Sequence, residues 1–128
     1  MTKNSKLAYF IIATIFFILF DIKLSNQIML NIENFPQNRF LDLIFMQNSG
    51  AAFNILANSK LFLILFSAVA ILGIIYYLLK NINNIKTFPI FWTALLTAGI
   101  FCNMHERIIY GYVRDFFKLN FIDFPVFN

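Results

Sequence analysis

The chain has 128 residues, of which 60% are apolar and 12% charged, and its formal net charge is +4. The charged content is about half that of an ordinary soluble domain, so we expect a single integral membrane domain over residues 1–128. The basic residues are scattered singly, which argues against a nucleic-acid partner. Cys102 and His105 each stand alone, so the spacing of a metal site is missing from the sequence.

The first apolar stretch covers residues 7–20 and follows Lys3 and Lys6. A bilayer span takes about 20 residues, so the predicted helix includes its polar flanks and covers about 5–23, with Asp21 near its end. A basic start before a short apolar run is also typical of a cleavable signal peptide. The residues that follow contain no small-x-small cleavage site, which favours an uncleaved anchor.

Residues 25–59 are amphipathic and contain a turn at 34–38. We expect this segment to lie on the membrane surface as short strands and an interfacial helix, forming a small β-containing platform. It includes a turn of small residues beside an amide, Asn48-Ser49-Gly50-Ala51-Ala52-Phe53. This turn is either a simple loop into the next helix or a substrate-facing loop, in which Gly50 permits special backbone geometry.

Two further apolar stretches, residues 61–79 and 88–104, predict transmembrane helices over about 60–80 and 87–106. The predicted fold class is therefore an all-α integral membrane protein with three transmembrane helices and the small platform. The N-terminal segment and the loop between the last two helices carry Lys but no acidic residue. The positive-inside rule places both in the cytoplasm and the platform outside it.

The third predicted helix ends in the polar run Asn103-Met104-His105-Glu106-Arg107. Residues three and four apart are neighbours on a helix, so Asn103, Glu106 and Arg107 share a face or its edge. This pattern is either a solvated helix end or a site in which an amide and a guanidinium orient Glu106 as a general acid or base. His105 points elsewhere and is left out of the predicted site.

Together these motifs resemble the lipoprotein signal peptidase family, signal peptidase II. Residues 48–53 match its Asn-x-Gly-Ala-Ala-Phe element in full, and residues 99–107 resemble its third helix, which ends Asn-x-x-Asp-Arg. Residues 111–116 resemble its Gly-x-Val-x-Asp-Phe stretch, and residues 124–128 resemble the start of its Pro-x-Phe-Asn-x-Ala-Asp motif. Asp21 stands where the family has an Asp that closes the first helix. The order and spacing agree over essentially the whole chain.

The resemblance implies a membrane aspartic endopeptidase that removes signal peptides from diacylglyceryl-prolipoproteins at the outer face of the cytoplasmic (inner) membrane. Two aspartates activate a water in this family, one protonated as acid and the other ionised as base, without a metal or other cofactor. The implied partners are diacylglyceryl-modified prolipoprotein signal peptides and membrane lipid, with no nucleic acid. We expect a multi-pass monomer with its active site on the extracytoplasmic side.

The resemblance also assigns site residues. Glu106 stands at the position of the first family Asp and is the expected catalytic residue. The expected substrate-binding or supporting residues are Asp21, Asn48, Gly50, Asn103, Arg107 and Asn128. Glu106 and all of these supporting residues except Asp21 are expected to converge in one outer cleft near the bilayer surface. Asp115 matches a separate family element and Asp123 has no clear counterpart, so neither is assigned a catalytic role.

The sequence departs from the family pattern in three ways. Glu106 replaces an Asp, and the second catalytic Asp and a fourth helix are expected beyond Asn128. The family's Asp-x-x-Ser/Thr-Lys appears as Asp21-Ile22-Lys23-Leu24-Ser25, without the Lys in place. A fragment, an incomplete gene and a decayed paralogue each fit these departures. We therefore expect little peptidase activity, and the alternative function is a non-catalytic membrane protein that binds lipidated or apolar peptides.

Overall fold

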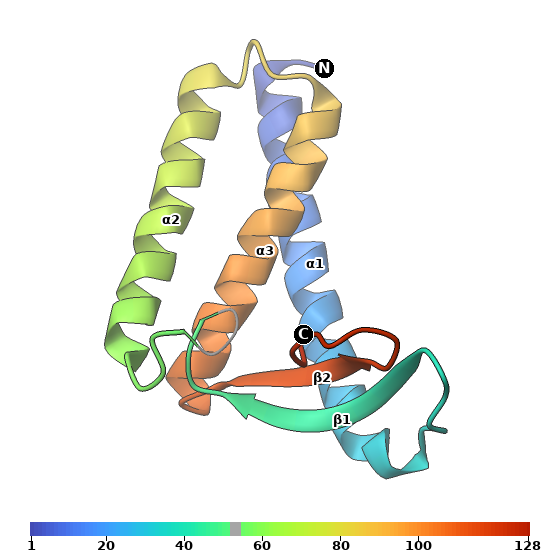
Figure 1. The fold of residues 1–128 in the computed structure, drawn as a ribbon. Helices are drawn as coiled ribbons and strands as arrows, with labels where there is room; N and C mark the ends of the chain where they lie inside the picture. Colours follow the sequence, from blue (N-terminus) through green and yellow to red (C-terminus); the bar gives the residue numbers. More distant parts are fainter. Residues whose placement is uncertain (52–54) are drawn as a thin grey trace.

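The computed structural model describes residues 1–51 and 55–128. Its elements in chain order are α1 (Lys3–Asn31), the 3-10 turn η1 (Ile32–Asn34), β1 (Leu41–Asn48), α2 (Lys60–Asn81), α3 (Thr87–Ile109) and β2 (Val113–Leu119). The helices run side by side, and the two strands lie across one end of them (Figure 1). The N-terminus and the α2–α3 connection lie at the other end. The predicted fold class, a mostly helical membrane protein with a small β-containing platform, is confirmed.

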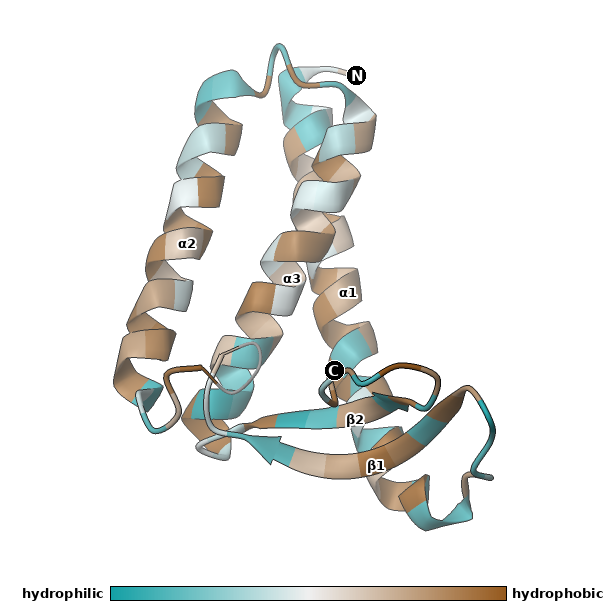
Figure 2. Ribbon diagram, in the orientation of Figure 1, coloured by the Kyte–Doolittle hydropathy of each residue, from teal (hydrophilic) through white to brown (hydrophobic). Residues whose placement is uncertain are grey.

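Three helical segments of the described chain are long and apolar enough to cross a membrane: Lys3–Asn34, Lys60–Asn81 and Thr87–Ile109. Apolar residues cover most of each helix, and polar residues gather toward the helix ends (Figure 2). Many of the apolar side chains face outward rather than into the protein. Such an apolar surface suits the hydrocarbon interior of a membrane. The helical backbone suits it as well, because helices satisfy their backbone hydrogen bonds internally.

Helix α1 is longer than the sequence predicted. It continues to Asn31, so residues 25–31, which were expected to begin the surface segment, extend the first helix instead. Neither Pro nor Gly occurs before Pro36 to interrupt it. The additional turns bring Asn26 up to the sheet, where its side chain contacts β2.

Helix α3 packs against both other helices. Its buried Ala94 and Ala98 are small, which lets helix backbones approach closely. Near the N-terminal end of the bundle, α1, α2 and α3 share an apolar core that includes Phe10, Leu78 and Ile90. This core fixes the direction of α3 and therefore the position of its polar end beside the sheet.

Lys6 ties the same end of the bundle together. Its Nζ donates hydrogen bonds to the backbone carbonyls of Ile82 at 3.0 Å, Asn83 at 3.3 Å and Ile85 at 2.7 Å. These carbonyls belong to the end of α2 and the connection to α3, where helix carbonyls lack intrahelical partners. One ammonium group thus joins α1 to the α2–α3 connection.

The platform is a two-stranded antiparallel sheet, paired from Leu41 with Leu119 to Asn48 with Val113. The C-terminal segment borders the other edge of β2, where the carbonyl of Phe127 accepts from the N–H groups of Phe116 at 2.9 Å and Phe117 at 2.8 Å. β2 is therefore enclosed on both edges, and its residues 113–116 are buried. β1 falls within the segment where strands are expected, whereas the strand at 113–119 is not predicted from the sequence.

Candidate active site

A cleft of about 200 Å³ opens where the sheet meets the end of α3. Its walls come from the end of β1, the last turns of α3, β2 and residues 124–128. The polar side chains that line it are Asn48, Asn103, Arg107, Asp115 and Asn128. The remaining lining residues are apolar, so the cleft combines a few polar groups with an apolar wall, as ligand sites commonly do.

Asp115 supplies the carboxylate of this cleft. Its side chain is buried, with 4% of the residue surface exposed, and its Oδ2 accepts a hydrogen bond from Asn48 Nδ2 at 3.0 Å. Burial raises the pKa of Asp115 above its ordinary value, and the negative charge of Glu106 raises it further. The Asn48 hydrogen bond and the positive charge of Arg107 act in the opposite direction. A carboxyl group balanced in this way is suited to both accept and donate a proton.

Asn48 connects Asp115 to the turn that follows β1. Its Nδ2 also donates to the carbonyl of Ala51 at 3.3 Å, and its Oδ1 accepts from the backbone N–H of Gly50 at 2.9 Å. A side-chain amide that bonds the backbone two residues ahead is a common turn device. The turn therefore fixes the Asn48 amide, and the amide in turn orients Asp115.

Arg107 joins α3 to the same turn. Its Nη2 donates to the carbonyl of Gly50 at 2.5 Å, and its Nη1 donates to the carbonyl of Asn103 at 3.1 Å. The residue is buried, and its Nε has no hydrogen-bond partner among the described residues. The guanidinium thus holds the turn with its terminal nitrogens and places a positive charge beside the cleft.

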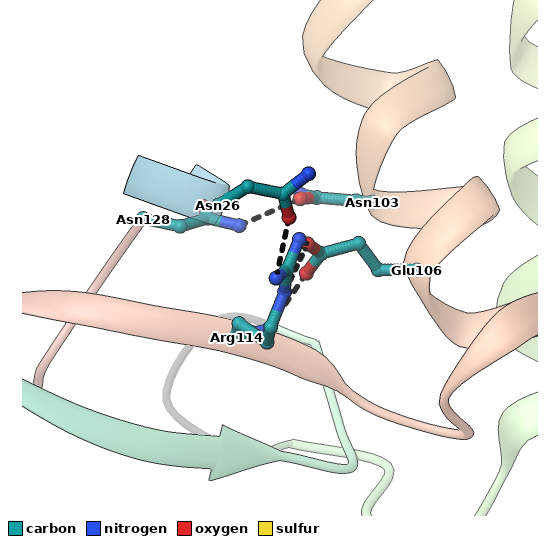
Figure 3. Close-up of polar contacts among 5 residues, drawn as sticks. All are labelled: Asn26, Asn103, Glu106, Arg114 and Asn128. Atoms are coloured by element: carbon teal, nitrogen blue, oxygen red, sulfur yellow. Dashed lines mark hydrogen bonds and ion pairs between the residues drawn. The ribbon is translucent and has the colours of Figure 1, made fainter. Parts of the chain in front are cut away.

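Asn103 and Asn128 meet at the rim. Asn128 Nδ2 donates to Asn103 Oδ1 at 2.7 Å, as the dashed line between them shows (Figure 3). This contact holds the C-terminal segment against α3. Residues 124–128 therefore form one wall of the cleft.

Glu106 does not line the cleft. Its carboxylate is buried and turned toward β2, where both oxygens bind Arg114 (Figure 3). Of the residues predicted to converge, Asn48, Asn103, Arg107 and Asn128 line the cleft, and Gly50 lies behind it as a partner of Arg107. The structure thus separates Glu106, the expected catalytic residue, from the polar groups expected to support it.

Asp21 also lies elsewhere. It lines a second, more apolar cavity between α1 and α3, together with Phe20 and Gly99. Part of the small-residue turn, Ala52 and Phe53, falls outside the described residues. His105 stacks on Phe101 with the ring centroids 6.3 Å apart, and it is not among the residues that line the cleft.

Asp115 is the site residue that reasoning from the sequence left unassigned. A signal for it was present, because Asp115 directly precedes Phe116 and Phe117, and an acidic side chain beside such apolar residues is costly to bury. A carboxyl group buried in a cleft with a raised pKa is a candidate for function on physical grounds. That criterion needs the burial of Asp115, which the sequence did not reveal.

Comparison with known proteins relates the whole chain to one family. The family model described as signal peptidase (SPase) II matches residues 7–128. The lipoprotein signal peptidase of Streptococcus pneumoniae is 36% identical over 89 residues, which cover 70% of this chain and 58% of that protein. The lipoprotein signal peptidase of Lactobacillus johnsonii is 32% identical over 130 residues, covering 98% of this chain and 84% of that one.

A solved bacterial membrane enzyme, determined by the in meso method, superposes with a TM-score of 0.81 at 28% identity, over 93% of this chain and 76% of that chain. The matches to the first of the curated relatives span little more than half of those proteins, 58% and 56% of their lengths. The family match nevertheless extends over nearly the entire chain, including the cleft. The protein is a membrane protein and belongs to the signal peptidase II family.

Proposed function

We propose that this protein is a lipoprotein signal peptidase in which Asp115 is one of two catalytic carboxyl groups. The observation that carries the proposal is the burial of Asp115 in a cleft, with Asn48 bonded to one of its oxygens and Arg107 nearby. Family membership supplies the reaction class, the cleavage of a signal peptide from a diacylglyceryl-modified prolipoprotein.

The mechanism requires a second carboxyl group. In an aspartic peptidase two close carboxyls share one proton, because both cannot ionise side by side. The ionised one takes a proton from the attacking water, and the protonated one donates to the substrate carbonyl or leaving amine. Asp115 is the one acidic residue among the described residues that line the cleft.

Residues 124–128 resemble the start of a family motif in which the partner Asp would come three residues after Asn128. Asn128 itself is held at the rim by Asn103. Three extended residues reach about 10 Å at most, at roughly 3.3–3.6 Å each. A carboxyl group three residues after Asn128 can therefore reach the cleft that Asp115 lines. This distance supports a pair of carboxyl groups, one from each side of the cleft.

The proposed substrate and location follow from the surroundings of the cleft. Val113, Phe124 and Val126 give it an apolar wall, which suits the apolar signal peptide of a prolipoprotein. The residues that line the cleft come from the sheet, the end of α3 and the C-terminal segment. The sheet lies at the end of the bundle opposite the N-terminus and the α2–α3 connection (Figure 1), and Lys6 binds that connection. With the lysine-bearing end in the cytoplasm, the active site faces the extracytoplasmic side of the cytoplasmic membrane. We propose a monomer that binds substrate from the surrounding lipid.

The test is cleavage of a diacylglyceryl-modified prolipoprotein in detergent micelles. Two proteins are compared: the 128-residue chain and a version extended to supply an Asp three residues after Asn128 and a further apolar helix. We expect the extended version to cleave and the 128-residue chain to show little turnover. In the extended version Asp115→Asn should lose activity by about 10³-fold or more, because the two carboxyls act as a unit.

Asp123→Asn is the matched control. Asp123 is exposed and does not line the cleft, so its replacement should leave activity within about two-fold, in the range of ordinary surface changes. Equal activity of the Asp115→Asn and Asp123→Asn variants would refute the proposal. Tight binding of a lipidated peptide without cleavage by the extended version would instead favour the non-catalytic alternative.

A further inference from the structure

Glu106 and Arg114 form a buried ion pair between α3 and β2 (Figure 3). Glu106 Oε2 accepts from the backbone N–H of Arg114 at 2.8 Å, and Oε1 accepts from Arg114 Nε at 2.6 Å and pairs with Nη2 at 2.5 Å. Both carboxylate oxygens are therefore occupied by one residue. Charge-assisted bonds of this kind are roughly twice as strong as neutral ones and fix geometry as well.

The guanidinium of Arg114 is held from two further directions. Its Nη1 donates to Asn26 Oδ1 of α1 at 3.1 Å, and its Cζ lies 4.8 Å from the centroid of the Tyr110 ring. The ion pair thus connects α3 and β2, and the Asn26 contact adds α1. Arg114 is therefore a direct polar link between β2 and both of these helices.

Arg114 directly precedes Asp115 in the strand. Successive side chains of a strand point to opposite faces, so Arg114 held on one face directs Asp115 to the other. On that other face Asn48 Nδ2 donates a hydrogen bond to Asp115 Oδ2 at 3.0 Å. The position of Asp115 is therefore fixed through its neighbour Arg114 on one face of β2 and through its hydrogen bond with Asn48 on the other.

We propose that Glu106 is a positioning residue, which anchors Arg114 so that Asp115 projects into the cleft at a fixed place. The inference rests on the proposed function of Asp115 and gives Glu106 a role other than the catalytic one expected from its sequence position. Its energetic basis is that a misplacement of about 1 Å can cost about 100-fold in rate, even when the change lies away from the chemistry.

The first test examines Asp115 directly in the 128-residue chain. A diazo reagent esterifies protonated carboxyl groups, and mass spectrometry of the peptide carrying Asp115 gives its rate against pH. In Glu106→Gln and Arg114→Met we expect the rate below the titration midpoint to rise by about five-fold or more, because the freed strand opens to the reagent. The double variant should match the single ones, because both substitutions remove the same anchor.

The titration midpoint provides a second readout. The charged groups that act on the pKa of Asp115 are Glu106 and Arg107 of α3, and the neutral Asn48 of β1 donates a hydrogen bond to it. Removing the negative charge of Glu106 should move the midpoint to lower pH. Glu33→Gln is the matched control, because Glu33 is exposed on η1, and its variant should keep the wild-type rate and midpoint.

The third test uses the extended, active version. Glu106→Gln should lower kcat by about 10–100-fold with KM within about three-fold, a smaller loss than that of Asp115→Asn. A loss as large as that of Asp115→Asn, with Asp115 titrating normally, would assign Glu106 to catalysis and overturn the inference. Wild-type esterification of Asp115 in Glu106→Gln and Arg114→Met would also overturn it.

Failure of the proposed function gives a different result. An extended version that never cleaves, while Glu106→Gln still alters esterification of Asp115, would reject the peptidase and support the anchoring of Asp115. If Glu106→Gln does not fold, Arg114→Met replaces it, because it removes the same anchor from the other side. A wild-type esterification rate of Asp115 in Arg114→Met would then overturn the inference.

Discussion

Replacing Asn48 with Ala removes three hydrogen bonds that organise the cleft. They join Asn48 to Asp115 at 3.0 Å, to the carbonyl of Ala51 at 3.3 Å and to the N–H of Gly50 at 2.9 Å. A neutral hydrogen bond contributes about 1 kcal/mol net, and one to a charged group about 1.5–3 kcal/mol. The two neutral bonds and the charged one together amount to about 3.5–5 kcal/mol. Asn48 is only half-buried, so in the Asn48→Ala variant water takes over some of these hydrogen bonds. We therefore expect the free energy of unfolding to fall by about 2–3 kcal/mol.

The loss should depend on pH, because the amide N–H of Asn48 stabilises the ionised form of Asp115 and lowers the pKa of that carboxyl. The destabilisation is therefore larger when Asp115 is ionised than when it is protonated. Unfolding in mixed micelles, followed by the fluorescence of Trp92, measures it at several pH values. Trp92 is the single tryptophan and lies in α3, and it does not line the cleft.

Gln47→Ala is the control for this measurement. Gln47 is the neighbouring amide on β1, but it is exposed, and its replacement should cost less than about 0.5 kcal/mol. An Asn48→Ala loss equal to that of Gln47→Ala, or one that does not change with pH, would contradict the assignment of Asn48 as the partner of ionised Asp115.

Three further outcomes are expected. Lys6→Met should destabilise the fold by about 2 kcal/mol in the same unfolding assay, because three backbone carbonyls lose a charged donor. Lys3 is exposed, and Lys3→Met should cost under about 0.5 kcal/mol. Equal effects of the two substitutions would contradict the role of Lys6 in joining α1 to the α2–α3 connection. Burial raises the pKa of Asp115, so the folded chain binds a proton at this carboxyl more tightly than the unfolded chain does. The stability that Asp115 contributes is therefore fully present below the pKa of the unfolded chain, and it is lost as pH rises through the pKa of the folded chain. Asp115→Asn should therefore be more stable than wild type at about pH 8, with the difference vanishing near about pH 3; a wild-type advantage at the higher pH would contradict the raised pKa. Reporter fusions at residues 84 and 128 should report opposite sides of the membrane, and the same side for both would exclude the proposed topology.

The sequence by itself determined the membrane class and the helices. An apolar run long enough to span a bilayer is a local property, so residues 61–79 and 88–104 predicted α2 and α3 without any knowledge of packing. The family motifs were equally local, and the family match over residues 7–128 agrees with them. The first helix was predicted too short, because the polar residues after Asp21 looked like a helix end. In the structure those turns continue to Asn31, and Asn26 contacts Arg114.

Only the tertiary structure decided which acid lies in the cleft. Glu106 lies in the polar end of α3 and Asp115 follows it closely in sequence, in β2. The local pattern does not say into which part of the fold either carboxylate points. The direction of each side chain depends on how β2 turns back and pairs with β1, which brings Asn48 to Asp115 and leaves Glu106 facing Arg114. Strand pairing across more than 60 residues is a long-range property of the fold, and it places one carboxylate in the cleft and the other in an ion pair.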